Sequence, residues 1–352
     1  MSRFLSSEQA SLKPYVPGEQ PQDRQYIKLN TNENPFPPSE EALRRAAEQV
    51  RSFELYSDPE ARALRAALAE RYQVSPDWVT VGNGSDEVLN MAFLAFVSPE
   101  RPALFPDITY GFYRVFADVN RLPWREIPLE DDLTVRLDRY AEDRKPHVVF
   151  LANPNAPTGI ALPAEEIARL ARRCPDSLVI VDEAYVDFGA ESCVPLTRQL
   201  DNLLVIQTFS KSRSMAGARL GYAIGQPQLI ADLQSIRYSL NPYNVNSYTQ
   251  ALGIAVLQDE ARTRRNCETI IANRGQLAAG LKALDFTVTD SRTNFLFART
   301  LRMNGGVLYQ MLKDRGILVR HFNQSRIVQY NRITVGTREQ NDALLAAIRD
   351  IL

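Results

Sequence analysis

The sequence has 352 residues, a length that suits about two domains. Its hydrophobic share of 45%, charged share of 24% and net charge of −1 are ordinary for a globular protein in water. No block of about five or six basic residues occurs, which argues against nucleic acid as a partner, and no apolar run approaches the roughly 20 residues of a membrane-spanning helix.

The first 40 residues are rich in Pro, Asn and Gln, and we expect them to form an extended arm with turns. Ser39 predicts the start of a helix, because its side chain can accept a hydrogen bond from the N–H of Ala42. The full capping box is absent, since Ala42 stands where Glu or Gln would complete it. The stretch 59–72 predicts an amphipathic helix with apolar residues at every fourth position, namely Leu64, Leu68 and Tyr72.

From residue 79 onward, short apolar runs alternate with polar or Gly/Pro residues and helical segments. Continuous apolar strands that alternate with helices are typical of a parallel sheet covered on both faces. We therefore expect an α/β fold in which a large domain holds a mainly parallel sheet between helices. The runs predicted to be strands are 79–81, 103–105, 147–152, 178–181, 203–208 and 220–224.

The last third of the chain predicts a smaller α+β domain. A helix over 244–258 leads out of the large domain, and a long helix over 262–284 follows it. Strands at 294–298 and 332–335 flank further helices. The expected division is an arm at 1–40 that joins the small domain, a large cofactor-binding domain at 41–258 and a small domain at 259–352.

Cysteine and histidine are too scarce for several kinds of site. Three scattered cysteines argue against a disulfide framework and favour a reducing compartment. With only His147 and His321, neither a zinc site nor a serine–histidine triad is expected, and we predict no metal. The first ten residues lack the basic end and apolar core of a signal peptide, so the expected location is the cytoplasm.

Parallel α/β sheets bind ligands at the carboxyl ends of their strands, so the residues that follow each apolar run are the candidates. The first run ends in a glycine-containing turn, Gly82-Asn83-Gly84-Ser85-Asp86, that passes into a predicted helix at 88–97. Free N–H groups at a helix start attract an anion such as phosphate, although the same residues also form ordinary helix caps. The turn is not the dinucleotide fingerprint, because Glu87 replaces the third glycine.

Asp182 ends the apolar run at 178–181, where a carboxylate is costly without a partner. It could pair with a protonated ring nitrogen of a pyridoxal cofactor. A solvated acidic loop and a magnesium ligand of a nucleotide hydrolase are the alternatives. A nucleotide hydrolase would also need the phosphate loop G-x-x-x-x-G-K-[ST], which is absent from the chain.

Lys211 follows the run at 203–208 and can be desolvated there, which lowers its pKa and favours Schiff-base chemistry. A lysine alone in such a place is usually just exposed. Here Arg219 follows within a short connection as a fixed cation for a phosphate, and Thr208 and Ser210 add hydroxyl groups. After the run at 147–152, the prolines of 153–159 make a rigid loop, which alone could be a plain turn.

Four motifs occur in a characteristic order: Asn-Pro-x-x-Pro-Thr-Gly, Asp-Glu-Ala-Tyr, Ser-Lys and Gly-x-Arg-x-Gly. On these motifs nearly the whole chain resembles the fold type I, aspartate-aminotransferase-like enzymes that use pyridoxal 5'-phosphate. Within that group it resembles the histidinol-phosphate aminotransferases. That closer resemblance rests on Leu29-Asn30-Thr31-Asn32-Glu33-Asn34-Pro35, Tyr56-Ser57-Asp58-Pro59 and the closing run from Arg332 to Gly336.

The resemblance implies a set of cofactor contacts. Lys211 would form the Schiff base and move the proton of the substrate α-carbon, and Asp182 would keep the pyridine nitrogen protonated. Tyr185 would hydrogen-bond the ring phenolate, and Tyr110 would stack on the ring. The residues expected around the cofactor phosphate are Gly84, Ser85, Asp86, Thr208, Ser210 and Arg219, with Tyr56 reaching across from a second subunit of a homodimer.

The same resemblance implies the substrates, glutamate/2-oxoglutarate and histidinol phosphate/imidazole acetol phosphate. Arg332 would bind the glutamate carboxylate or the phosphate of the amine, since a planar guanidinium suits both anions. Asn34, Arg320 and Tyr15 would assist, although Arg320 and Tyr15 could equally be a surface charge and a packing aromatic. An aromatic amino-acid aminotransferase and a threonine-phosphate decarboxylase-like enzyme remain open. So does a non-catalytic pyridoxal-binding regulator, for which the chain offers no spare length or basic patch.

Two places depart from the family pattern. Ala156 stands directly before Pro-Thr-Gly, where the family has an Asn that bonds the ring oxygen, and Asn155 is one position out of register. Loss of one hydrogen bond to a charged oxygen is worth about 1.5–3 kcal/mol, which should alter the Schiff-base pKa without abolishing the chemistry. The loop at 322–331 also differs, and this affects the substrate assignment more than the reaction class.

Overall fold

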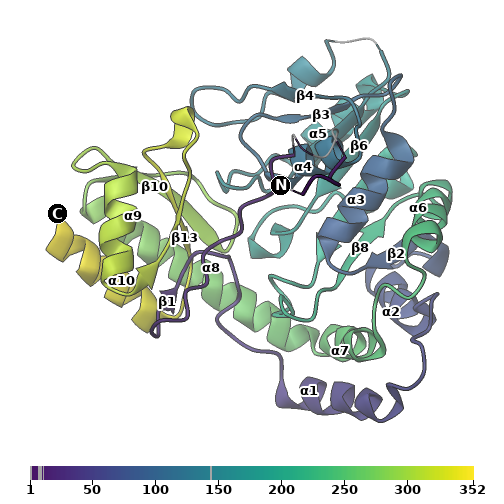
Figure 1. Ribbon diagram of the computed structural model, residues 1–352, viewed down its shortest axis with the longest axis horizontal. Coiled ribbons are helices and arrows are strands. Elements are labelled where there is room, and N and C mark those ends of the chain that lie inside the picture. Colours follow the sequence, from purple (N-terminus) through teal and green to yellow (C-terminus); the bar gives the residue numbers. More distant parts are fainter. Residues whose placement is uncertain (1, 7–9, 11, 143–144) are drawn as a thin grey trace.

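The computed structural model describes residues 2–6, 10, 12–142 and 145–352. The two larger of the three sheets in the described residues stand side by side, each with its own helices, and the N-terminal arm crosses from one part of the molecule to the other (Figure 1). In the part of the chain that is described, no helix combines the length and the apolar character needed to span a bilayer.

The large sheet has seven strands in the order β2-β8-β7-β6-β5-β3-β4. All neighbours pair in parallel except β8, which is antiparallel to both β2 and β7, so the prediction of a mainly parallel sheet is confirmed. The strands are β2 (Val79–Gly82), β3 (Ala103–Pro106), β4 (Trp124–Ile127), β5 (Val148–Ala152), β6 (Leu178–Asp182), β7 (Leu203–Thr208) and β8 (Gly221–Ile224).

Helices cover both faces of this sheet, which explains its continuous apolar strands. Along β6, Val179 and Val181 belong to one core, whereas Ile180 belongs to the other. Strand β4 was not predicted, because its sequence Trp-Arg-Glu-Ile is only partly apolar and it forms the edge of the sheet. The helices of this part are α1 (Glu40–Ala47), α2 (Arg62–Tyr72), α3 (Ser85–Phe96), α4 (Phe112–Val119), α5 (Ala164–Arg173), α6 (Pro227–Leu240) and α7 (Ser247–Gln258). Ser39 caps α1 through Ala42 as predicted.

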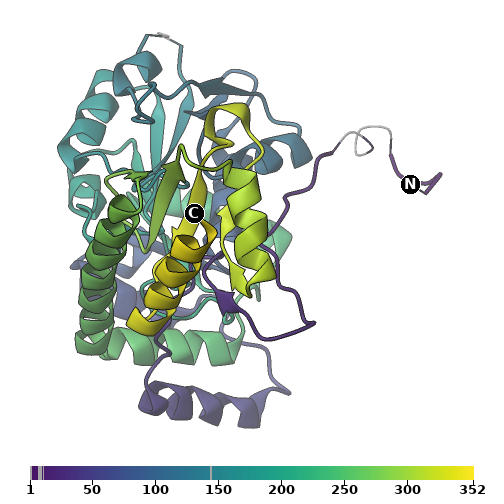
Figure 2. The ribbon, with the colours of Figure 1, turned by 90° about the vertical axis from the view of Figure 1, so that its left-hand side faces the viewer.

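The smaller unit has an antiparallel sheet in the order β12-β13-β10-β9 and a core of its own. Its strands are β9 (Phe286–Val288), β10 (Phe295–Thr300), β12 (Arg320–His321) and β13 (Asn331–Thr334), and its helices are α8 (Glu260–Ala283), α9 (Gly305–Asp314) and α10 (Arg338–Ile351). In the arm, β1 (Ile27–Lys28) pairs in parallel with β11 (Ile317–Leu318). Figure 2 shows the start of the chain projecting away from this body. The exact domain limits at 40 and 258 stay a prediction.

A buried ion pair ties the loops after β6 and β7 together. Arg213 has only 1% of its side chain exposed, and its guanidinium lies 2.8 Å from a carboxylate oxygen of Asp187. Burial alone would raise the pKa of Asp187, but the charge of Arg213 holds that pKa below its ordinary value. Ser212 donates a hydrogen bond to the same carboxylate. The clamp therefore fixes the residues directly after Lys211.

We expect Asp187→Ala to lower the free energy of unfolding by about 3 kcal/mol, because it leaves the buried Arg213 charge without its partner. Urea denaturation of the cofactor-free protein measures this loss. Asp342→Ala is the matched control, since Asp342 pairs with Arg338 on the exposed face of α10 and should change stability by less than about 0.5 kcal/mol. Equal, small losses of unfolding free energy in both variants would show that the Arg213–Asp187 pair does not stabilise the fold.

Candidate active site

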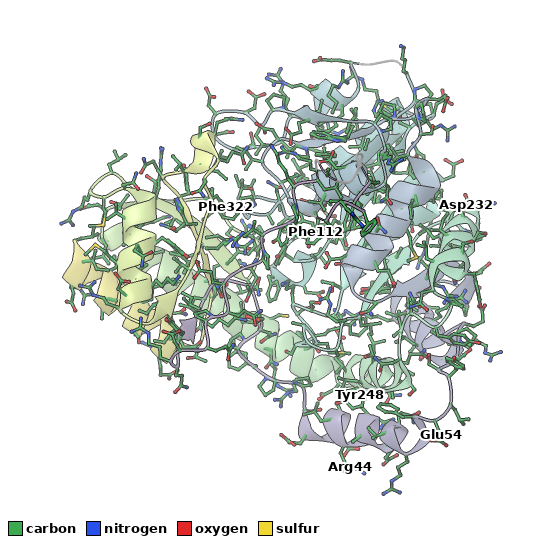
Figure 3. All side chains as sticks on the ribbon, in the orientation of Figure 1. Arg44, Glu54, Phe112, Asp232, Tyr248 and Phe322 are labelled. Carbon is green, nitrogen blue, oxygen red and sulfur yellow. The ribbon has the colours of Figure 1, made fainter. Side chains whose placement is uncertain are left out.

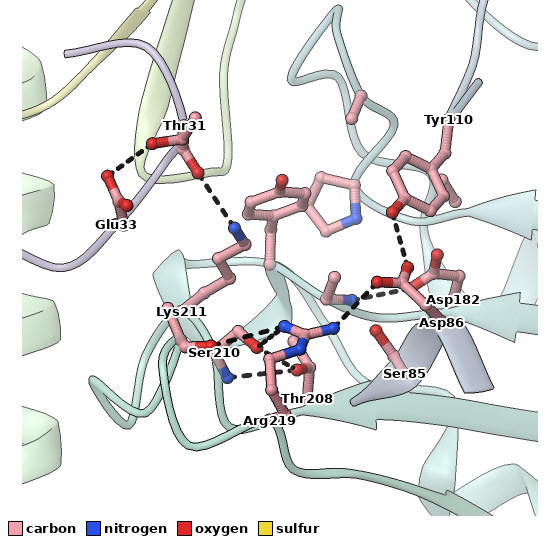
Figure 4. Close-up of a pocket in the computed structure, with 16 residues that line it drawn as sticks. Thr31, Glu33, Ser85, Asp86, Tyr110, Asp182, Thr208, Ser210, Lys211 and Arg219 are labelled. Atoms are coloured by element: carbon pink, nitrogen blue, oxygen red, sulfur yellow. Dashed lines mark hydrogen bonds and ion pairs between the residues drawn. The ribbon is translucent and has the colours of Figure 1, made fainter. Parts of the chain in front are cut away.

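The carboxyl ends of β6 and β7 bring Asp182 and Lys211 to one pocket. The two strands are parallel neighbours, with Asp182 opposite Ile206, so the residues that follow each strand emerge at the same edge of the sheet. The pocket also receives the first turn of α3, the loop after β5 and the arm. Figure 4 shows these contributions around the pocket, with the Lys211 amine pointing across it toward Thr31.

One end of the pocket is rich in hydrogen-bond donors. The helix α3 begins at Ser85, after Gly84, whose φ of +83° favours glycine. A Cβ on Gly84 would come within 2.4 Å of an Arg219 nitrogen, so glycine permits the close approach of that guanidinium. Arg219 lies 3.0 Å from an Asp86 oxygen and 3.4 Å from the Ser210 hydroxyl. The Thr208 hydroxyl bonds Ser210 at 3.0 Å.

Asp182 also lines the pocket and is buried, with 5% exposure. Burial raises the pKa of its carboxyl to about 6. The Tyr113 hydroxyl donates to one carboxylate oxygen at 3.0 Å, and the Ala184 N–H donates to the other at 3.2 Å. Tyr113 was not predicted, although it lies on α4 only three residues after Tyr110.

The Lys211 amine donates to the carbonyl of Thr31 at 3.1 Å. Burial, followed by the nearby charge of Arg332, lowers the pKa of Lys211 to about 8. Behind the amine, the Asn34 side chain donates to the carbonyls of Lys211 and Ser212 at 3.1 and 3.2 Å. Asn34 thus holds the backbone of the lysine loop and does not line the pocket, where it was predicted to bind substrate.

Two tyrosines predicted to contact the cofactor ring line the pocket. Tyr110 donates to a carboxylate oxygen of Asp86 at 2.6 Å (Figure 4), and burial raises its pKa well above the ordinary value. Tyr185 accepts a hydrogen bond from the Asn32 side chain at 2.9 Å. Burial also raises the pKa of Tyr185, against the lowering effects of Arg332 and Asn32.

Ala156 lines the pocket, whereas Asn155 does not. The Asn155 amide donates to the Ile108 carbonyl at 3.0 Å, and its oxygen accepts from the Thr109 hydroxyl at 2.8 Å. Its polar atoms are therefore engaged inside the loop that precedes α4. Asn155 therefore does not take the place of the family's Asn at the pocket.

The residues predicted to bind substrate come from the small unit and the arm. Arg332 donates to the Asn30 carbonyl at 3.0 Å, while its Nε is buried without a hydrogen-bond partner among the described residues. Arg320 donates to the carbonyls of Val16 and Pro17 at 2.7 and 2.9 Å, so it fastens the arm. Tyr15 stacks on Phe112, with 4.2 Å between ring centroids.

The loop at 322–331 reaches across to the large unit. It carries a short 3-10 turn at Ser325–Ile327, and Arg326 lies 2.8 Å from a carboxylate oxygen of Asp107. In Figure 3, Phe322 and Phe112 both lie in the middle of the view, where the two units meet. The loop that departs from the family pattern thus packs beside the site.

Tyr56 lies outside the lining of the pocket. Its side chain is 83% exposed and stacks on Tyr243 at 4.4 Å, so its expected role depends on a second subunit. Thr31 and Glu33 line the pocket without having been assigned roles. An extended arm has no helical or strand periodicity from which a pocket contact could be deduced. The only indication in the sequence for these two residues was the arm motif that contains them, from Leu29 to Pro35.

Comparison with known proteins identifies relatives over the whole chain. The model of the family "Aminotransferase class I and II" matches residues 24–348. Histidinol-phosphate aminotransferase 1 of Bradyrhizobium diazoefficiens is 48% identical over 352 residues, which cover 100% of both chains. Histidinol-phosphate aminotransferase of Acetobacter pasteurianus is 48% identical over 354 residues, with 100% of this chain and 99% of that protein covered.

Among solved structures, histidinol-phosphate aminotransferase from Sinorhizobium meliloti in complex with pyridoxal-5'-phosphate superposes with a TM-score of 0.89. The alignment covers 100% of this chain and 99% of that chain at 23% sequence identity. At this identity the superposition shows that the two chains share a fold. It agrees with the α/β architecture predicted from the sequence.

We expect Lys211 of the cofactor-free protein to react with acetic anhydride in its neutral form, with a half-maximal rate near pH 8. The reason is that burial favours the uncharged amine. Mass spectrometry of the Lys211 peptide across a pH series measures the profile, and the exposed Lys282 of α8 serves as the internal reference for reagent activity. A midpoint near the ordinary value of 10.5 would show that the amine is solvated.

Proposed function

This chain belongs to the family of class I and II aminotransferases, and from that premise we propose that it exchanges an amino group between two substrate pairs. One pair is glutamate and 2-oxoglutarate, and the other is histidinol phosphate and imidazole acetol phosphate. Membership confirms the predicted class of enzyme, a pyridoxal-phosphate-dependent aminotransferase with an α/β fold. The observation that carries the substrate proposal is the 48% identity, over the full length, to two histidinol-phosphate aminotransferases.

The chemistry of the pocket fits pyridoxal 5'-phosphate, which when bound supplies an electron-withdrawing ring. We propose that the free N–H groups at the start of α3, together with Thr208, Ser210 and Arg219, hold the phosphate. The carboxylate of Asp86 would repel that anion and instead pairs with Arg219 and Tyr110. The backbone N–H of Asp86 would therefore bind the phosphate, and its carboxylate would orient Arg219.

Asp182 would hold a proton between its carboxylate and the pyridine nitrogen. Its two hydrogen bonds fix the orientation of the carboxylate, and its burial makes an unpaired charge costly, so a cationic partner is favoured. Tyr110 would stack on the ring, and Tyr185 would donate to the ring oxygen.

Lys211 would bind the cofactor aldehyde and, once the amino substrate displaces it, move a proton at its Nζ. With a pKa of about 8, a tenth or so of the amines are neutral at pH 7, which an ordinary lysine does not achieve. The Thr31 carbonyl offers the released amine a hydrogen-bond acceptor 3.1 Å away. The lowered pKa and the nearby acceptor suit the lysine for both covalent attachment and proton transfer.

The environment of Arg332 favours the binding of an anionic substrate. Burial lowers the pKa of its guanidinium, and its buried Nε has no hydrogen-bond partner among the described residues. A carboxylate or phosphate would satisfy the buried Nε and neutralise the charge, and both proposed substrate pairs carry such a group. Arg320 and Tyr15 close the arm over the same region.

We also propose a homodimer in the cytoplasm. The segment 50–56 and the segment 238–243, which runs from the end of α6 into the next loop, expose apolar side chains and meet through the Tyr56–Tyr243 stack. Glu54 marks the first segment at the outer edge of Figure 3. The exposed apolar residues there are Val50, Phe53, Leu55, Tyr56, Tyr238, Leu240 and Tyr243. A second copy would cover them and place Tyr56 at the partner's phosphate site. Cys174, Cys193 and Cys267 are free thiols, which favours a reducing compartment.

We expect Lys211→Ala to remove the visible absorption band that the wild type gains with pyridoxal 5'-phosphate and to lower turnover by at least roughly a thousandfold. Lys282→Ala, at an exposed lysine of α8, should behave as the wild type. The substrate is identified by mixing the yellow enzyme with histidinol phosphate, glutamate, phenylalanine and threonine phosphate, and recording which amine bleaches the band. A clear preference for phenylalanine or threonine phosphate would overturn the proposed pair.

We expect the double variant Phe53→Glu/Leu55→Glu to be monomeric in sedimentation equilibrium, because it places charges on the proposed contact. Leu301→Glu is the control, because Leu301 is 90% exposed on the small unit. This variant should remain dimeric like the wild type. If the Phe53/Leu55 variant remained dimeric, the contact between copies would lie elsewhere.

A further inference from the structure

The Tyr185 hydroxyl has one hydrogen-bond partner among the described residues, and that partner is the arm. The Asn32 Nδ2 donates to the Tyr185 oxygen at 2.9 Å. Because an Asn amide nitrogen only donates, this bond makes the Tyr185 oxygen an acceptor. The hydroxyl proton of Tyr185 is then left to be donated in another direction.

Neighbouring bonds fix which end of the Asn32 amide faces Tyr185. The Asn32 backbone N–H donates to the Thr334 hydroxyl oxygen, so the Thr334 proton is available and is donated to Asn32 Oδ1, both at 3.0 Å. The Asn32 carbonyl accepts from the Asn294 side chain at 2.9 Å. Asn32 is 1% exposed, and its φ of +59° is one that Asn tolerates better than most residues. The amide is thus held with its donor toward Tyr185.

The pocket side of Tyr185 is the direction left for its proton. Tyr185 and Ala156 both line the pocket, and the Ala156 methyl group can donate no hydrogen bond. The Tyr185 and Phe295 rings pack perpendicular to each other with 5.1 Å between centroids, which limits rotation of the Tyr185 ring. The hydroxyl is therefore preset as a donor toward the pocket.

We propose that Asn32 is a positioning residue that acts through Tyr185: it occupies the acceptor side of the hydroxyl and strengthens the hydroxyl as a donor to the cofactor's ring oxygen. This inference rests on the proposed function, because it requires the pyridoxal ring beside Tyr185. The chain of donors runs from Thr334 through Asn32 to Tyr185, and hydrogen bonds in such a chain polarise one another. The bond from Asn32 also lowers the pKa of Tyr185 against the raising effect of burial. In this way a residue of the arm, which does not itself line the pocket, makes up in part for the donor that Ala156 lacks.

The test follows the visible absorption band of the holoenzyme, which titrates as the nitrogen joining Lys211 to the cofactor loses its proton. A strong donor to the ring oxygen reduces the negative charge that holds this proton. We expect Asn32→Gly to raise the midpoint of this titration by about half a pH unit. The shift should be small because Asn32 acts on the ring oxygen only through Tyr185. Glycine keeps the positive φ, so the arm is not strained.

The decisive comparison is made in a Tyr185→Phe background. If Asn32 acts through the hydroxyl, Asn32→Gly should leave the midpoint of Tyr185→Phe unchanged. An equal shift in both backgrounds, or no shift in the wild type, would overturn the proposal. Asn30→Ala is the matched control, because Asn30 is an equally buried arm residue whose amide bonds the Glu19 carbonyl, and it should not move the midpoint.

A second variant guards against misfolding of Asn32→Gly. Thr334→Val removes the hydroxyl that orients the Asn32 amide and should raise the midpoint in the same direction by less. Thermal unfolding of each cofactor-free variant separates lost stability from a changed midpoint. A wild type that never gains colour with pyridoxal 5'-phosphate would refute the proposed function, whereas a coloured enzyme with unmoved midpoints would refute the role of Asn32 alone.

Discussion

Desolvation at the carboxyl ends of β6 and β7 is the constraint on which the site depends. The two strands are buried on both faces, so the ionisable groups that follow them lie where water is scarce. Burial moves the pKa of Asp182 up to about 6 and that of Lys211 down to about 8, toward each other and toward neutrality. The same burial thus keeps the lysine partly neutral and leaves the carboxylate in need of a cationic partner.

Much of this arrangement could be predicted from the sequence, because the information is local. Apolar runs specify strands, and the alternation of strands with helices specifies parallel pairing. The carboxyl ends of those strands converge at one edge, so Asp182 and Lys211 could be placed together without coordinates. Arg219 could be placed near them because only a short connection separates it from Lys211. The edge strand at 124–127 was missed because an exposed strand carries polar residues and resembles a loop.

The remaining contacts join residues far apart in the chain and leave no periodic signal. Asn34 illustrates this: its amide bonds the carbonyls of Lys211 and Ser212, which lie 177 and 178 residues further along the chain. Tyr113 carries no signal in the sequence, because a tyrosine on an amphipathic helix is usually a packing residue. Its contact with Asp182 depends on how α4 sits on the sheet, and side-chain spacing cannot supply that information.

The pairing of the arm has a consequence for synthesis on the ribosome. Ile27 and Lys28 pair with residues 317 and 318, and Asn32 bonds Thr334, so the arm's partners are translated nearly 300 residues after it. The seven-stranded sheet, whose last strand ends at Ile224, can form earlier. The parallel pairing of β1 must therefore wait until residues 317 and 318 have been made, whereas the contacts of Thr31 and Asn34 with residues 211 and 212 can form earlier.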